Sequence, residues 1–254
     1  MTINPSDRGL LLADGLFETL RIENHRPLLL TRHLQRLQSS CRTLAIPYVE
    51  ADICQAVENA IAPCSDGPYA MRLTITRGPG PRGLLPPETP KPTILTAVSP
   101  ANPRDKTIVR AALATTQRNA GSPASSMKSL QYLDNILARQ EAGPDRDDAI
   151  MLNTAGLPAC TTIGNILVRR DDGWVTPPTA IGGVLPGIVR AVLIESGRVR
   201  EDNLSTDDLF RFPLARSNSL TGVQAMTLPC GVPSEPEAAW ELTQVLETAE
   251  AREL

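Results

Sequence analysis

The chain has 254 residues, of which 41% are apolar and 21% charged, and its formal net charge is -3. This composition is typical of a folded globular protein and argues against a disordered chain. Aromatic residues make up only 3% and basic residues are not in excess, so a nucleic-acid partner is not expected.

The five cysteines are scattered without a C-x-x-C pair, and the only histidines are His25 and His33. Neither a metal site nor a disulfide framework is therefore expected. No apolar stretch reaches the roughly 18 residues of a membrane helix, and the first residues do not resemble a signal peptide. These patterns predict a cytoplasmic protein with no membrane partner.

Apolar periodicity predicts strands and helices in alternation over the first half of the chain. The predicted strands are residues 16–22, 70–76, 93–98 and 107–114. The predicted helices are residues 31–45, which Thr31 would cap, and residues 50–62. A long loop rich in Gly and Pro follows at 77–92 and is typical of a binding loop. It lacks the spacing of a P-loop.

The second half repeats this mixture after a small, polar segment at 119–126, which predicts a linker. A helix is predicted over 130–142, with a buried face formed by Leu130, Leu133, Ile136 and Leu137. Further strands are predicted at 148–153, 164–169 and 173–176, and further helices at 187–197 and from about 235 onward. We therefore predict two α/β domains, residues 1–118 and 127–254, with a ligand cleft between them.

A few side chains could carry chemistry. Lys128 follows the linker, where a deprotonated lysine could form a Schiff base with a carbonyl, although a solvated lysine is the simpler interpretation. Arg36 could bind phosphate or lie on the surface. Arg72, Arg77 and Arg82 surround the long loop and could bind a substrate carboxylate or be solvated. No acidic run lies near them to act as a salt-bridge partner.

These segments follow one another in an order that resembles the class IV aminotransferases, the fold-type IV enzymes that use pyridoxal phosphate. Residues 6–46 resemble the family's opening, a D-G-x-F-E-T strand followed by H-x-x-R-L. The later motifs are the lysine segment 127–133, N-[IL]-[FL] at 165–167, T-P-P at 176–178, L-P-G-I-T-R at 185–190 and a final turn at 218–220. The resemblance runs from Ser6 to about Met226, nearly the whole chain.

The resemblance implies a homodimeric enzyme that binds pyridoxal 5'-phosphate in the interdomain cleft and acts on a small amino substrate. Lys128 would form the Schiff base and move protons at the substrate α-carbon. The residues implied to contact the cofactor phosphate are Arg36, Ser219 and the turn at Gly187, with the backbone N–H groups of Ile188 and Val189. Tyr132 would bind near the phenolic oxygen. Arg82, with Arg72 as a further candidate, would bind a substrate carboxylate.

Two departures from the family pattern concern the cofactor. Val189 replaces the threonine of L-P-G-I-T-R, so one hydroxyl is lost. The family also has a glutamate five residues before the asparagine of N-[IL]-[FL], and counting back from Asn165 gives Cys160. That glutamate keeps the ring nitrogen protonated, whereas a neutral neighbour leaves it less protonated. We expect this change to favour elimination over transamination.

The resemblance leaves two activities open. One is a lyase reaction of folate synthesis, which cleaves 4-amino-4-deoxychorismate to pyruvate and p-aminobenzoate. The other is transamination of D-amino or branched-chain amino acids. The lyase is favoured by the R-G-x-G-x-R-G-like loop at 77–83, by the uninterrupted spacing from Lys128 to Tyr132 and by Cys160. A member that binds the cofactor without turnover is disfavoured, because Lys128 and Arg36 are retained.

Overall fold

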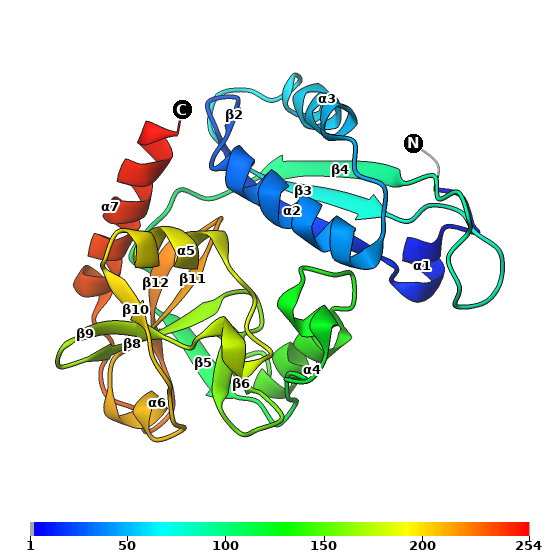
Figure 1. The fold of residues 1–254 in the computed structure, drawn as a ribbon. Helices are drawn as coiled ribbons and strands as arrows, with labels where there is room; N and C mark the ends of the chain where they lie inside the picture. The colour runs from blue at the N-terminus through cyan, green and yellow to red at the C-terminus, as the bar shows by residue number, and fades with distance from the viewer. Residues whose placement is uncertain (1–2, 254) are drawn as a thin grey trace. The chain divides into compact units, whose positions relative to one another are not determined.

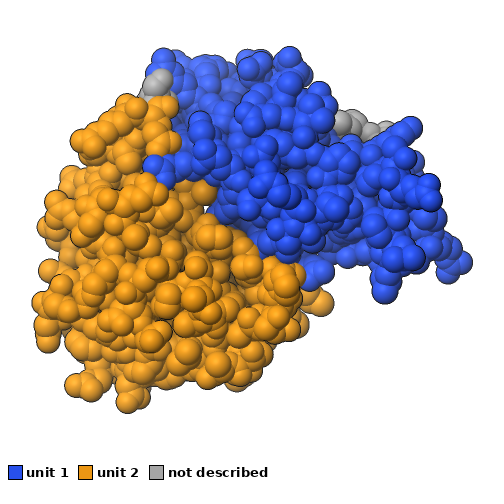
Figure 2. Space-filling model, viewed as in Figure 1, with its two compact units in different colours: residues 1–102, 127–131, 254 blue, residues 103–126, 132–253 orange. Residues whose placement is uncertain are grey.

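The computed structural model of the protein describes residues 3–253 and has a mixed α/β fold, as predicted (Figure 1). These residues group into two compact units, coloured in Figure 2. Unit 1 contains the described residues up to Asn102 and the segment Met127–Gln131. Unit 2 contains Pro103–Ser126 and Tyr132–Glu253. The domain boundaries at residues 118 and 127 stay a prediction.

Main-chain pairing explains why residues 127–131 belong to unit 1. The backbone N–H of Phe17 donates to the carbonyl of Lys128 at 2.8 Å, and the N–H of Leu130 donates to the carbonyl of Gly15 at 3.0 Å. Leu16 and Ser129 form an isolated antiparallel bridge. The lysine segment is thus fixed to the strand that carries the D-G-x-F-E-T motif.

Unit 1 is built on an antiparallel sheet with the strand order β2-β1-β3-β4. Its strands are β1 (Gly15–Glu23), β2 (Arg26–Pro27), β3 (Pro68–Thr76) and β4 (Thr93–Pro100). Its helices are α1 (Arg8–Leu12), α2 (Leu30–Leu44) and α3 (Glu50–Ile61). Because side chains alternate along a strand, β1 directs its leucines to one face and Phe17 to the other.

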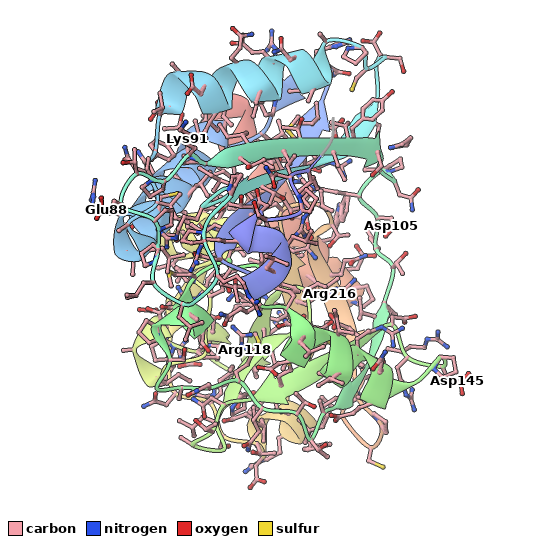
Figure 3. The ribbon with its side chains drawn as sticks, turned by 90° about the vertical axis from the view of Figure 1, so that its right-hand side faces the viewer. Glu88, Lys91, Asp105, Arg118, Asp145 and Arg216 are labelled. Carbon is pink, nitrogen blue, oxygen red and sulfur yellow. The ribbon has the colours of Figure 1, made fainter. Side chains whose placement is uncertain are left out.

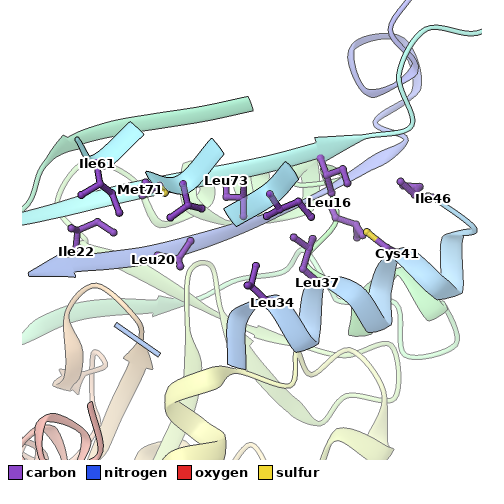
Figure 4. Close-up of a cluster of buried hydrophobic side chains, with 13 residues drawn as sticks. Leu16, Leu20, Ile22, Leu34, Leu37, Cys41, Ile46, Ile61, Met71 and Leu73 are labelled. Atoms are coloured by element: carbon purple, nitrogen blue, oxygen red, sulfur yellow. The ribbon is translucent and has the colours of Figure 1, made fainter. Parts of the chain in front are cut away.

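One hydrophobic core joins β1 and β3 to α2 and α3 (Figure 4). Its buried side chains are Leu16, Leu20, Ile22, Leu34, Leu37, Cys41, Ile46, Ile53, Val57, Ile61, Met71, Leu73 and Ile75. The predicted cap of α2 is wrong: the helix begins at Leu30, and its N-cap is Leu29, which has a left-handed φ of 54° and no side-chain cap. Leu29 is buried, so packing rather than a capping hydroxyl fixes this end of the helix.

Unit 2 is built on an eight-stranded sheet with the order β10-β9-β8-β11-β12-β5-β6-β7. Its strands are β5 (Val109–Leu113), β6 (Asp148–Leu152), β7 (Pro158–Thr161), β8 (Asn165–Arg170), β9 (Gly173–Thr176), β10 (Val199–Glu201), β11 (Leu214–Asn218) and β12 (Gly222–Thr227). Its helices are η1 (Pro123–Ser126), α4 (Leu133–Ala142), η2 (Thr179–Ile181), α5 (Ile188–Glu195), α6 (Asp208–Arg211) and α7 (Pro236–Arg252). No helix among residues 3–253 is long and apolar enough to cross a membrane.

The predicted buried face of α4 is wrong. The helix starts at Leu133, and it buries Asn135 and Ala138. Leu133, Ile136 and Leu137 are exposed by 65%, 50% and 43%. Ala138 packs into a core of unit 2 that contains four alanines together with Met151, Cys160 and Val184, so this helix contacts the core through its small residues rather than its large ones.

Candidate active site

Lys128 lies beside the ring of Phe17 in unit 1. Its Nζ is 4.5 Å from the ring centroid, and Arg72 places its guanidinium carbon 3.7 Å from the same centroid. Cations are attracted to the face of an aromatic ring at such distances. Of the chain's three lysines, Lys91 and Lys106 are exposed, whereas Lys128 is half-buried. Lys128 is therefore the one lysine of the three that lies in a partly buried environment.

The pKa of Lys128 is lowered from 10.5 to about 8. Burial is the largest cause, because it disfavours the charged amine, and the positive charge of Arg36 and then that of Arg72 act in the same direction. Glu18 opposes them. A pKa near 8 leaves roughly a tenth of the amine uncharged at pH 7, and only the uncharged amine is a nucleophile or a base.

Glu18, His33 and Arg36 form a buried polar cluster, called here the Glu18 cluster. Arg36 donates from Nε to Glu18 Oε1 at 2.8 Å and from an Nη to Oε2 at 2.5 Å, and His33 Nδ1 is 2.7 Å from Oε2. Burial alone would raise the pKa of Glu18, but the Arg36 charge and the His33 hydrogen bond lower it to about 2. The Glu18 carboxylate therefore holds the guanidinium of Arg36 in one orientation.

The three arginines near the long loop have different environments. Arg72 and Arg82 are exposed. Arg77 is buried and donates to Asp14 at 2.7 and 3.0 Å, and it also donates to the carbonyls of Leu44 and Ala45 at the end of α2. The partner of Arg77 is thus one distant carboxylate rather than a neighbouring acidic run, and Arg77 is a structural residue. Asp14 lies far from it in the sequence and was not recognised.

Cys160 lies in β7 of unit 2, where it is buried and pairs with Met151 of β6. Burial raises the pKa of its thiol to about 11, with Arg118 lowering it and Asp148 raising it. The side chain is consequently a neutral thiol at physiological pH. It cannot supply the negative charge of a carboxylate.

The start of α5 is an open helix N-terminus. Its N-cap, Gly187, has no side chain that could cap the first backbone N–H groups of the helix, which begin at Ile188 and Val189. Asn165 donates to the carbonyl of Leu185 at 2.9 Å, and a Cβ at position 187 would collide with Asn165 Oδ1. A glycine is therefore required at this position, and such a helix start is suited to binding an anion.

The remaining predicted residues also lie in unit 2. Tyr132 is the N-cap residue of α4, and Ser219 follows β11 in the turn that leads to β12. The carbonyl of Ser219 accepts a hydrogen bond from Arg104 at 3.3 Å. The hydroxyl of Ser217 is buried without a hydrogen-bond partner among the described residues. This unpartnered hydroxyl and the open helix start are both groups that a phosphate could satisfy.

A buried ion pair in unit 2 was not predicted from the sequence. Arg216, labelled in Figure 3, donates to Asp148 at 2.7 Å and to Gln224 at 3.0 Å. Asp148 also accepts from the backbone N–H and the hydroxyl of Thr162. Asp148 is fully buried, so removing Arg216 would leave an uncompensated charge. Arg216 lies on β11 and Asp148 on β6, so no local pattern in the sequence indicates that they pair.

Comparisons with known proteins agree with this arrangement. A family model described as amino-transferase class IV matches residues 15–227. The chain is 29% identical over 202 residues to the aminodeoxychorismate lyase of Bacillus subtilis (strain 168), which covers 77% of this chain and 69% of that protein. It is 27% identical over 219 residues to the D-alanine aminotransferase of Listeria monocytogenes (strain 10403S), covering 82% and 75%.

Among solved structures, the 4-amino-4-deoxychorismate lyase of Pseudomonas aeruginosa superposes with a TM-score of 0.86 at 28% identity, covering 100% of this chain and 96% of that one. This match confirms the predicted fold. The family model and the relatives likewise confirm the resemblance drawn from the motifs, and the chain belongs to the amino-transferase class IV family of pyridoxal-phosphate-dependent enzymes.

Proposed function

We propose that this protein is a 4-amino-4-deoxychorismate lyase. The observation that carries the proposal is the match to the Pseudomonas aeruginosa lyase, which extends over 100% of this chain. The Bacillus subtilis relative bears the same activity in its name. The neutral thiol of Cys160 supports the proposal chemically, because it favours elimination over transamination.

The residues present fit pyridoxal 5'-phosphate. The groups that would bind the cofactor's phosphate are Arg36, the start of α5 and Ser219. Tyr132 would hydrogen-bond near the phenolic oxygen, and Lys128 would form the covalent link. The cofactor supplies a sink for the electrons released at the substrate carbon that carries the amino group. Arg36 is already oriented for this role by Glu18.

Lys128 would move protons during the reaction. Its lowered pKa lets the amine take a proton from the ring carbon that carries the substrate amino group. The bond between the ring and the ether oxygen of the enolpyruvyl group then breaks, pyruvate leaves with the returned proton, and the ring becomes aromatic as p-aminobenzoate. This elimination balances without an oxidant or a reductant. Arg72 and Arg82 would bind the substrate carboxylates.

The proposal is tested by incubating the cofactor-loaded protein with 4-amino-4-deoxychorismate and following the fluorescence of p-aminobenzoate. D-alanine and L-leucine are supplied in parallel reactions, in which loss of the bound cofactor's absorbance reports transamination. Formation of p-aminobenzoate supports the lyase. Absence of p-aminobenzoate together with a reaction of either amino acid would contradict it.

Changing Cys160 to Glu is expected to speed the transamination half-reaction with D-alanine about tenfold, because a carboxylate beside the ring nitrogen raises that nitrogen's pKa. The Cys160→Gln variant is the matched control, since Gln has the size of Glu without its charge. The half-reaction is followed by rapid mixing and absorbance. If both variants react at the wild-type rate, the role assigned to the neutral thiol is refuted.

Transamination of D-amino acids is the second candidate function. It is favoured by the 27% identity to the Listeria D-alanine aminotransferase over 82% of this chain. The two candidates differ in the fate of the amino group. A transaminase leaves it on the cofactor, whereas the lyase releases it as part of p-aminobenzoate.

We further propose that the protein acts as a homodimer in the cytoplasm and contributes to folate synthesis. Support for an assembly comes from apolar side chains that the single chain leaves in contact with solvent. In α4 these are Leu133, Ile136 and Leu137, and in unit 1 Leu10 and Leu11 are exposed by 65% and 61%. Exposed apolar groups of this kind are typical of protein interfaces.

A further inference from the structure

One buried side chain, that of Arg8, contacts the middle of the long loop between β3 and β4. Arg8, which is 4% exposed, donates from Nη1 to the carbonyls of Gly83 at 2.9 Å and Leu85 at 3.3 Å. It also donates from Nη2 to the carbonyl of Leu84 at 2.9 Å. Three consecutive carbonyls of the loop thus converge on one guanidinium, and Gly83, with a φ of 113°, allows this turn.

The orientation of Arg8 is itself fixed. Its Nε donates to Asp14 at 2.9 Å, and Arg77 donates to the same carboxylate oxygen at 2.7 Å. Burial raises the pKa of Asp14, but hydrogen bonds from Arg77 and then Arg8 lower it overall, so the carboxylate stays charged. The backbone N–H of Arg8 also donates to the carbonyl of Gly78 at 3.0 Å. Arg8 therefore contacts the loop at both its start and its middle.

Arg77 anchors the start of the loop, but the leucines at its middle do not anchor it. Leu84 and Leu85, whose carbonyls bind Arg8, are exposed by 83% and 84%. The loop therefore gains little from apolar burial to offset the conformational entropy lost on ordering it. Packing against Arg8 is also close, since a Cβ at Gly80 would lie 2.8 Å from Arg8 Cδ. The last part of the loop contains Glu88 and Lys91, which are labelled in Figure 3.

We infer that Arg8 is a positioning residue that sets the conformation of residues 79–87 and thereby the place of Arg82 for substrate binding. Arg82 immediately precedes the three carbonyls bound by Arg8, and its own side chain is exposed. Arg8 donates to four acceptors, the three carbonyls and Asp14, from a planar fork of five donors, whereas a lysine ammonium has only three donors. The inference rests on the proposed function only for the carboxylate that Arg82 would bind.

Limited trypsin digestion of the holoenzyme tests the loop directly, because Arg82 is exposed and is followed by a glycine. The Arg8→Lys variant keeps a positive charge beside Asp14 but loses the fork. We expect it to be cut after Arg82 about tenfold faster than the wild type, as measured by mass spectrometry. The control is Arg26→Lys, at an exposed arginine of unit 1, and this variant should be cut after Arg82 at the wild-type rate.

Gly80→Ala is the second variant, and it displaces the Arg8 side chain without changing any charge. Gly80→Ala should also speed cleavage after Arg82. If the Arg8→Lys protein does not fold, the Gly80→Ala protein is used for the test instead. Cleavage at the wild-type rate in the folded variants would overturn the inference. The cleavage rates test whether Arg8 fixes the loop and do not depend on catalytic activity. A wild type that yields no p-aminobenzoate would refute the proposed function and leave this test unaffected.

Steady-state kinetics test the consequence for the substrate. We expect Arg8→Lys to raise KM for the dicarboxylate 4-amino-4-deoxychorismate about tenfold, with kcat and the affinity for pyridoxal phosphate changed less than threefold. A purely structural defect would lower kcat and cofactor affinity together. Faster cleavage with an unchanged KM would overturn the link between the loop and substrate binding.

Discussion

Replacing Lys128 with alanine is expected to lower turnover by about 10⁴-fold or more, since the residue would serve as both the covalent attachment and the proton carrier. The variant should still fold, because the contacts that fix its segment to β1 are made by the main chain. Turnover is measured with a saturating amount of cofactor. The visible absorbance of the bound cofactor is recorded for the same samples.

Lys106→Ala is the matched control for this change. Lys106 is exposed and pairs with Glu237 at 2.5 Å, so its loss should leave both turnover and cofactor absorbance at wild-type values. If the Lys128→Ala variant kept the absorbance of the lysine-linked cofactor, a different lysine would carry the link. The chain offers only Lys91 and Lys106 as alternatives, and both are exposed.

The Glu18→Gln change is expected to cost about 3 kcal/mol of unfolding free energy, because it removes a buried carboxylate that Arg36 and His33 both contact. Glu58→Gln, at an exposed position of α3, should change it by less than about 0.5 kcal/mol. Both are measured by denaturant unfolding of the cofactor-free protein. A Glu18→Gln protein as stable as the wild type would show that the cluster contributes no stability.

The same cluster predicts a dependence on pH. The pKa of Glu18 is about 2 in the folded protein against an ordinary 4.5, so folding favours its charged form. Its stabilisation is therefore fully present above about pH 4.5 and is lost as the pH falls toward 2. The wild type should lose stability faster than Glu18→Gln over this interval. Parallel acid-unfolding curves for the two proteins would contradict the assignment.

Elements with a strong local pattern could be predicted from the sequence. The apolar spacing of Leu34, Leu37 and Cys41 predicted α2, and all three side chains are buried in the core of unit 1. Strand β3 was predicted from its alternation, which the burial of Met71 and Leu73 bears out. Such a pattern indicates which face of a helix or strand is buried, and it can be recognised from a few residues that are close in the sequence.

Burial that depends on distant partners could not be predicted in this way. The leucines of α4 have the spacing of a core face, yet Ala138 is buried while Leu133 is exposed, because the helix turns its Ala138 side toward the core of unit 2. Short strands such as β7, with four residues, carry too few side chains to show a period. Strand β12 was not predicted either; it forms by pairing with β11 on one side and β5 on the other.

The charged groups show the same limit. Glu18 shares its side of β1 with Leu16 and Leu20, and this alternation is a local signal of a buried carboxylate from which no prediction was made. Which cation pairs with it was not visible, because Arg36 lies on another element. Arg77 and Asp14 are 63 residues apart, and Arg8 reaches a loop 75 residues away. Only the folded chain shows these pairs.

The most direct test of the central claim counts product per subunit in the absence of any 2-oxo acid. The cofactor-loaded protein is mixed with an excess of 4-amino-4-deoxychorismate, and p-aminobenzoate and pyruvate are both quantified. A lyase regenerates its cofactor in every cycle, so we predict many equivalents of each product per subunit in a 1:1 ratio. A reaction that stops after one equivalent per subunit, and resumes when a 2-oxo acid is added, would identify a transaminase and contradict the account.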